Sequence, residues 1–319
     1  MDPITEPGTI DDMVADAAAA GHTVTPRLIR DWTQQGLLDY PQKRPAGKGH
    51  GSEQALYCAN QRNLLLTLLH HREGKNISSL ARIPVAIWMY WGEQYVPLRQ
   101  AKRALIRFLG DPETASLASD ALRATKQRAR EAARAITGQL GHPDATPQAR
   151  RELQQVLADA GYTGLIDYDR LDTAIRGVFE PGYHGVRRAV GHPAAPMLAD
   201  SVITGIKARI SAITALLAGR VSDDDLTDAR DAHLFAYADY AARQPYLAAA
   251  APRDRPDMYE PVTAEQALSD CCGHLLSTIG LQMMFPEQTR QMKQARAFHR
   301  RPTLAAFGLT AQAIQQQRR

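Results

Sequence analysis

The chain has 319 residues, 44% of them hydrophobic, and is long enough for two or three domains with buried cores. It contains no run of 18 apolar residues and no N-terminal apolar signal segment, so we expect a cytoplasmic protein with no membrane partner. Its three cysteines, two of them adjacent, argue against a disulfide framework.

The formal charge of +4 is unevenly distributed along the chain. Residues 27–50 carry a net charge of +3, residues 99–134 of +5 and residues 286–319 of +6, whereas residues 221–270 carry −7. The basic segments fit an acidic partner such as nucleic acid. The alternative for each of them is a solvated helix face.

Helical patterning dominates the sequence, because Ala, Leu, Arg and Gln are abundant and alternating β-branched runs are almost absent. Segments rich in Gly and Pro interrupt the pattern at residues 36–51, 138–147, 180–196 and 250–261. The predicted helices cover residues 9–20, 26–35, 52–72, 77–90, 95–109, 112–138, 147–160, 168–179, 195–218, 223–249, 262–284, 286–298 and 303–317.

Residues 9–72 form one predicted unit: a helix, a turn, a second helix, a short apolar Gly-Leu-Leu segment, a basic ribbon and a long closing helix. Thr25 precedes Pro26 and is the predicted N-cap of the second helix, and Ser52 is the predicted cap of the closing helix. Trp32 is expected in the core. This order of elements suits duplex DNA, because a helix fits the major groove and a basic ribbon can follow phosphates.

The residues expected to contact DNA lie on the second helix and on the ribbon. Arg27 and Arg30 are on the outward face of the helix, where Asp31 can orient one of them. Glycines in the ribbon allow close approach to the phosphates. The full candidate set is Thr25, Arg27, Arg30, Lys43, Arg44, Lys48 and His50.

The string RLIRDWTQQGLLDYPQKR, followed by GKGHGSEQAL, resembles the MerR superfamily of winged helix-turn-helix transcriptional regulators. The residues that match the family pattern are Arg30, Trp32, Gly36, Leu37, Leu38, Ser52, Glu53 and Leu56. The resemblance covers about a quarter of the chain. It implies a homodimer that binds a pseudo-palindromic operator and distorts promoter DNA, and hence a nucleoid-associated location.

The sequence departs from the family pattern in three ways. His50 and Gly51 stand where the family usually has Arg-Tyr before the closing helix, and the first turn is extended over residues 17–21. The C-terminal part matches no effector domain that we can identify. These departures leave open which wing residue reaches DNA and what signal is sensed.

The predicted fold is mainly α, with a winged helix-turn-helix domain at residues 1–110 and an all-helical dimerisation or effector domain at residues 111–319. The expected function is sequence-specific transcriptional regulation. One alternative is a DNA-organising, partition or mobile-element accessory protein with the same DNA reader. Another is a helical enzyme or interaction module, although no catalytic motif is present and neither an enzyme nor a cofactor is expected.

Two features of the C-terminal part have competing interpretations. His233, Tyr237 and Tyr240 share a helix face, which either lines a pocket for a small-molecule or protein effector or packs against another helix. Cys271 and Cys272, close to a histidine, lack the spacing of a zinc site, so we predict helix-core cysteines and no metal.

Overall fold

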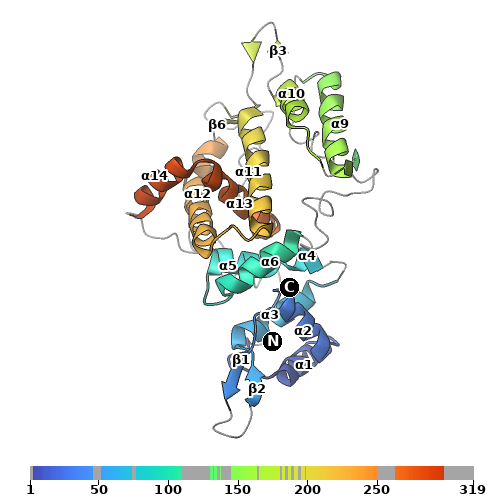
Figure 1. Cartoon of the computed structure of the whole chain (residues 1–319), viewed down its shortest axis with the longest axis vertical. Helices are drawn as coiled ribbons and strands as arrows, with labels where there is room; N and C mark the ends of the chain where they lie inside the picture. Colours follow the sequence, from blue (N-terminus) through green and yellow to red (C-terminus); the bar gives the residue numbers. More distant parts are fainter. Residues whose placement is uncertain are drawn as a thin grey trace. The chain divides into compact units, whose positions relative to one another are not determined.

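The described part of the chain is mainly helical, as its composition predicts (Figure 1). A computed structural model describes residues 3–45, 52–73, 77–109, 130–131, 133–134, 137, 145–163, 165–179, 182–183, 186–187, 190–192, 195–197, 199–249 and 263–297. The chain divides into two compact units, the first built from residues up to 109 together with 263–274, and the second from the rest of the described chain. Every helix in these ranges is too short or too polar to span a membrane.

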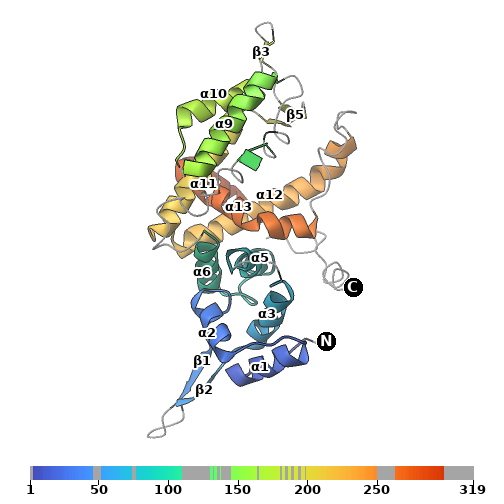
Figure 2. The same ribbon diagram turned by 90° about the vertical axis from the view of Figure 1, so that its right-hand side faces the viewer.

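The first unit contains helices and one two-stranded antiparallel ribbon, which projects from the helices in Figure 2. Its elements are α1 (Ile10–Ala19), α2 (Pro26–Gln34), β1 (Gln42–Pro45), β2 (Ser52–Leu56), α3 (Ala59–His70), α4 (Ile77–Leu80), α5 (Arg82–Trp91) and α6 (Leu98–Leu109).

Side-chain caps start the first two helices. Thr9 and Asp12 form a capping box at α1, in which the Thr9 hydroxyl accepts a hydrogen bond from the Asp12 amide and the Asp12 carboxylate accepts one from the Thr9 amide. At α2 the Thr25 hydroxyl accepts from the Leu28 amide at 3.2 Å, and Pro26 occupies the first helical position. The predicted cap at Thr25 is confirmed.

A Schellman motif ends α2. The Leu37 amide donates to the Trp32 carbonyl at 3.0 Å, and the Gly36 amide donates to the Thr33 carbonyl at 3.2 Å. Gly36 has a φ angle of +80°, in the left-handed region that favours glycine. The next residues, Leu37 and Leu38, are fully buried. The Gly-Leu-Leu segment therefore reverses the chain and anchors it in the core.

The prediction of a helix over residues 52–72 is wrong at its start. Ser52, Glu53 and Leu56 lie in β2, which pairs with β1. The following residue, Tyr57, exchanges two backbone hydrogen bonds with Gly8. Because these partners satisfy the backbone groups in an extended conformation, the helix begins only at Ala59. Ser52 is therefore not a helix cap.

The core of the first unit consists of apolar side chains that the helical spacing places on one face of each helix. Trp32, as predicted, is buried, and so are Leu65, Leu68, Trp88 and Leu105. The predicted helix 77–90 is divided at residue 81 into α4 and α5.

The second unit contains further helices and two small antiparallel hairpins. The segment at residues 180–196 was predicted to interrupt the helical pattern. The paired strands in and beside it are β3 (Gly182–Tyr183) with β4 (Val186–Arg187), and β5 (Val190–His192) with β6 (Ala195–Met197). The prediction of an all-helical domain at residues 111–319 is therefore wrong in this segment, because its backbone groups pair between short strands. The helices are α9 (Pro147–Thr163), α10 (Tyr168–Phe179), α11 (Ala199–Leu217), α12 (Asp223–Ala249), α13 (Ala264–Met284), whose first residues belong to the first unit, and α14 (Pro286–Ala297).

The predicted helix 195–218 begins four residues late, at Ala199, because residues 195–197 pair in β6. Further along, α11 and α13 approach so closely that a Cβ on Gly280 would lie 1.8 Å from the Ala208 carbonyl oxygen. The predicted helix 303–317 and most of 112–138 lie outside the described residues.

Candidate nucleic-acid interface

The outward face of α2 is cationic. Arg27, Arg30 and Gln34 are exposed. The Arg27 side chain is 90% exposed, and its Nε lies 3.9 Å from Asp31 Oδ2, the i,i+4 neighbour that the sequence indicates. Arg30 has no hydrogen bond or ion pair with any described residue. Both guanidinium groups are therefore available to a ligand.

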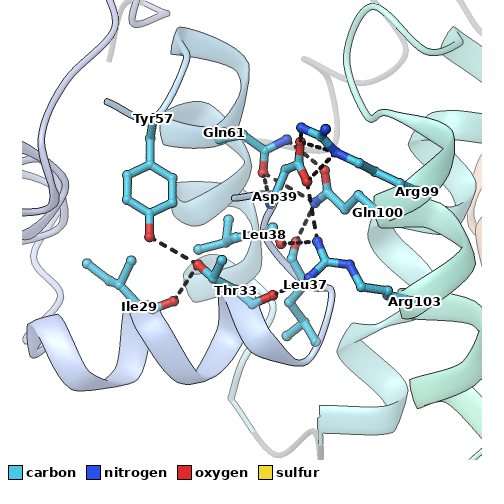
Figure 3. A network of polar contacts seen from close by, with 10 residues as sticks. All are labelled: Ile29, Thr33, Leu37, Leu38, Asp39, Tyr57, Gln61, Arg99, Gln100 and Arg103. Atoms are coloured by element: carbon cyan, nitrogen blue, oxygen red, sulfur yellow. Dashed lines mark hydrogen bonds and ion pairs between the residues drawn. The ribbon is translucent and has the colours of Figure 1, made fainter. Parts of the chain in front are cut away.

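The inward face of α2 is fixed by a polar contact beneath the helix. Ile29, Trp32 and Thr33 are buried. The Thr33 hydroxyl donates to the Ile29 carbonyl at 2.8 Å and lies 3.1 Å from the Tyr57 hydroxyl (Figure 3). This bond links α2 to the segment that leaves β2, so the helix and the base of the ribbon are held together.

A buried carboxylate ties the end of α2 to α6. The Asp39 side chain is 7% exposed and accepts three hydrogen bonds from Arg99, the shortest 2.7 Å from Arg99 Nη2 (Figure 3). Arg103 adds a bond from Nη2 to Asp39 Oδ1 at 3.3 Å, and its Nη1 donates to the Thr33 carbonyl at 2.8 Å. Hydrogen bonding to Asp39 raises the pKa of the Arg99 guanidinium.

Two buried glutamines extend this network towards α3. The Asp39 amide donates to Gln61 Oε1 at 2.8 Å, and the Gln61 and Gln100 side-chain amides bond to each other. Gln100 Nε2 also donates to the Leu37 carbonyl at 2.9 Å. Each buried polar group in this set has a partner, so the network stabilises one geometry for the turn that follows α2.

The ribbon offers one free cation and one paired cation among its described candidates. The Lys43 side chain is exposed and makes no hydrogen bond or ion pair with another described residue. Arg44 is held within the ribbon, since its Nη1 lies 3.0 Å from Glu53 Oε2 and its Nε donates to the Gln54 carbonyl at 3.2 Å. Arg44 must break or share these bonds to contact a ligand. Lys48 and His50 lie outside the described residues.

The face of α2 is bordered by a shallow hollow of about 310 Å³. Its lining includes Arg30 and Gln34 from α2, Ile10 from α1, and Tyr40 and Tyr57 from either side of the ribbon. The guanidinium of Arg103 stacks on the Tyr40 ring, 4.2 Å from its centroid. Of the residues around this hollow, Arg30 was predicted from the sequence and Tyr40 was not. The network of Asp39 with the arginines of α6 was not predicted either.

The predicted effector face lies on α12 in the second unit. His233 and Tyr237 stack with ring centroids 6.2 Å apart, and Tyr240 is half-buried. Burial, with a smaller contribution from Tyr240, raises the pKa of the Tyr237 hydroxyl. The three side chains therefore share a face, as predicted. The hollow beside α2 does not include them, and their role as an effector site remains a prediction.

The cysteines of α13 are core residues, as expected. Cys271 and Cys272 are fully buried, and their sulfur atoms lie 3.9 Å apart. Hydrogen bonding to Cys271, together with burial, raises the pKa of the Cys272 thiol. Within the described ranges, no group of three or more His, Cys, Asp or Glu side chains is arranged to hold a metal ion.

Comparison of the chain with models of known protein families, with curated proteins and with solved structures gives no match. Any functional conclusion about this surface therefore depends on its geometry and charge.

Proposed function

We propose that the chain is a transcriptional regulator whose first unit binds double-stranded DNA as a winged helix-turn-helix domain. In this proposal α2 enters the major groove, and the β1–β2 ribbon lies along the sugar-phosphate backbone. The observation that carries the proposal is the outward face of α2, where Arg27 and Arg30 are exposed beside a ribbon that carries Lys43.

Rigidity behind this face supports the proposal. A recognition helix must hold its side chains in register with base edges, and a buried polar network is one way to fix its position. The Asp39 carboxylate, the Gln61–Gln100 pair and the Arg103 bond to the Thr33 carbonyl together hold α2 from its inner side. The exposed arginines thus stand on a fixed support.

We further propose that the protein acts as a homodimer. One recognition helix reads only a half-site, and tight specific binding generally requires two of them on a pseudo-palindromic operator. Sedimentation of the full chain at micromolar concentration, with and without DNA, tests this step. A protein that stays monomeric in both conditions contradicts it.

DNA binding itself is tested by fluorescence anisotropy of the full chain with a random-sequence duplex over a range of salt concentrations. We expect the affinity to fall by about 0.9 log units per log unit of salt for each phosphate contacted. On a duplex that the wild-type chain selects from a random library, the double variant Arg27→Gln/Arg30→Gln should weaken binding. The double variant Arg151→Gln/Arg220→Gln removes the same charge from two exposed positions in the second unit and is the matched control. No binding, or affinity independent of salt, contradicts the proposal.

A further inference from the structure

A second hollow in the first unit contains two arginines. It has a volume of about 470 Å³ and lies among α2, the end of α3, α4 and α6. Leu28 and Trp32 of α2 form part of an apolar wall, which Ile77 and Leu80 extend. The polar groups at its surface come from Arg72, Ser78 and Arg107.

The described residues around this hollow supply no negative charge to balance its two arginines. No aspartate or glutamate lines it, and neither Arg72 nor Arg107 forms an ion pair with any described residue. Arg72 instead stacks over Trp32, with its Cζ 5.8 Å from the ring centroid. Two guanidinium groups therefore face one hollow without a counter-charge from the described chain.

Arg107 provides a second, independent observation. Its Nε is buried and has no hydrogen-bond partner among the described residues. A buried donor without a partner is costly, and in folded proteins such groups are generally satisfied by a neighbouring residue, water or a bound ion. An anion bound in this hollow could accept a hydrogen bond from the Nε–H group of Arg107 and balance the positive charge of Arg72.

We propose that this hollow binds a phosphate group. A phosphate monoester carries about −1.5 to −2 charges at neutral pH, which matches two guanidinium groups better than a single carboxylate does. Guanidinium groups bind phosphate through paired N–H···O bonds, and apolar neighbours strengthen these bonds by lowering the local dielectric constant. The Ser78 hydroxyl, which also lines the hollow, is a further potential donor.

The site also contacts the proposed reader helix. Leu28 and Trp32 line the hollow, while Arg27 and Arg30 are exposed on the other side of α2. A bound phosphate would therefore brace α2. The phosphate can belong to a free molecule or to a DNA backbone, and the chemistry of recognition is the same for both sources.

Thermal unfolding of the full chain in inorganic phosphate, compared with chloride at equal ionic strength and without DNA, tests the site. At ten times the Kd, phosphate should raise the Tm by roughly 2–5 °C, because a ligand that binds only the native state stabilises it. Arg107→Gln and Arg72→Gln should lose this shift, and Arg151→Gln, which has an exposed position on α9, should keep it. Because Arg72 is exposed, its variant provides the test even if Arg107→Gln fails to fold.

The salt dependence of binding to a random duplex identifies the source of the phosphate. If Arg107→Gln lowers the slope of log affinity against log salt by about one unit, the site takes a DNA phosphate. If the slope is unchanged while the phosphate-specific Tm shift depends on the two arginines, the site takes a free phosphate. Equal shifts in phosphate and chloride, or shifts that both variants retain, overturn the proposal. If phosphate raises the Tm of the wild-type chain but the chain does not bind DNA, the proposed function is contradicted and the phosphate site is not.

Discussion

Gly36 and Arg103 lie so close together that a Cβ on Gly36 would be 2.6 Å from the Cβ of Arg103. The backbone nitrogen of Ala104 would be only 2.8 Å away. The turn that ends α2 therefore packs against the α6 backbone itself, and the Arg103 side chain continues past this point to the carbonyls of Thr33 and Leu38. The absence of a side chain at position 36 is what allows α6 to support α2.

Replacing Gly36 with alanine should lower the free energy of unfolding by about 2–4 kcal/mol. The positive φ angle alone costs about 1–2 kcal/mol for a non-glycine residue, and the contact with α6 adds an overpacking cost. Urea denaturation followed by circular dichroism measures the loss. Gly21→Ala is a matched control, because Gly21 has φ +82° but nothing within 4 Å of its Cβ position. Equal losses in the two variants would show that the contact with Arg103 is unimportant.

Asp39→Asn should destabilise the chain by about 1.5–3 kcal/mol. The carboxylate is buried and accepts charge-assisted hydrogen bonds from Arg99 and Arg103, which a neutral amide replaces poorly. The control is Asp31→Asn, whose exposed pair with Arg27 at 3.9 Å should contribute less than about 1 kcal/mol. The same denaturation experiment measures both variants, and a smaller loss for Asp39→Asn than for Asp31→Asn would argue against a supporting role for the network.

In the second unit, Gly280→Ala should be strongly destabilising. The new Cβ would be 1.8 Å from the Ala208 carbonyl oxygen, so α11 and α13 would have to move apart. Gly205→Ala is the control, because Gly205 is also helical and has open space around its Cβ position. That substitution should stabilise the chain by about 0.5–1 kcal/mol through helix propensity. Thermal unfolding should therefore give Tm shifts of opposite sign for the two variants.

The local elements of the first unit could be predicted from the sequence because each has a short-range signal. Helical spacing of apolar residues predicts α1 and α2 within one residue of their observed ends. Thr25 before Pro26 marks the start of α2, and Gly36 marks its end. The exposure of Arg27 and Arg30 follows from the same period.

Features that depend on distant partners could not be predicted. The segment at residues 52–56 carries alanine, glutamate and leucine, which favour a helix, but it pairs with β1. Asp39 bonds to Arg99, 60 residues away, and no periodic pattern connects the two. The phosphate-binding candidates Arg72, two residues after the end of α3, and Arg107 of α6 are also far apart in the sequence. In each case the tertiary partner, and not the local sequence, determines the outcome.

The capping box of α1 gives a prediction for pH. Hydrogen bonds from the Thr9 amide, and then from its hydroxyl, hold the pKa of Asp12 below its ordinary value of 3.8. The stabilisation by the Asp12 carboxylate is therefore fully present above pH 3.8 and is lost as the pH falls through the lower value of the folded state. A carboxyl NMR titration should show this low pKa, and Thr9→Val should raise it part of the way. A pKa of Asp12 at or above 3.8 in the wild-type chain would contradict the hydrogen bonds of the capping box.

The roles proposed for α2 and the ribbon predict different consequences of removing a cation. If Arg30 reaches a base edge, Arg30→Ala should weaken binding to the operator by about 1–3 kcal/mol and affect random DNA much less. Lys43 lies in the ribbon, where a phosphate contact would be independent of sequence. Lys43→Ala should therefore weaken binding to both DNAs by similar factors and lower the salt slope by about one unit.

The most direct test of the account is the ratio of operator affinity to random-DNA affinity at two salt concentrations. The operator is first selected from a random duplex library with the wild-type chain. We expect Arg30→Ala to lower this ratio by roughly 5- to 150-fold, whereas Lys43→Ala and the matched control Arg151→Ala should leave it unchanged. If Arg30→Ala keeps the wild-type ratio of operator affinity to random-DNA affinity while Lys43→Ala lowers it, the assignment of α2 as the helix that reads the major groove is contradicted.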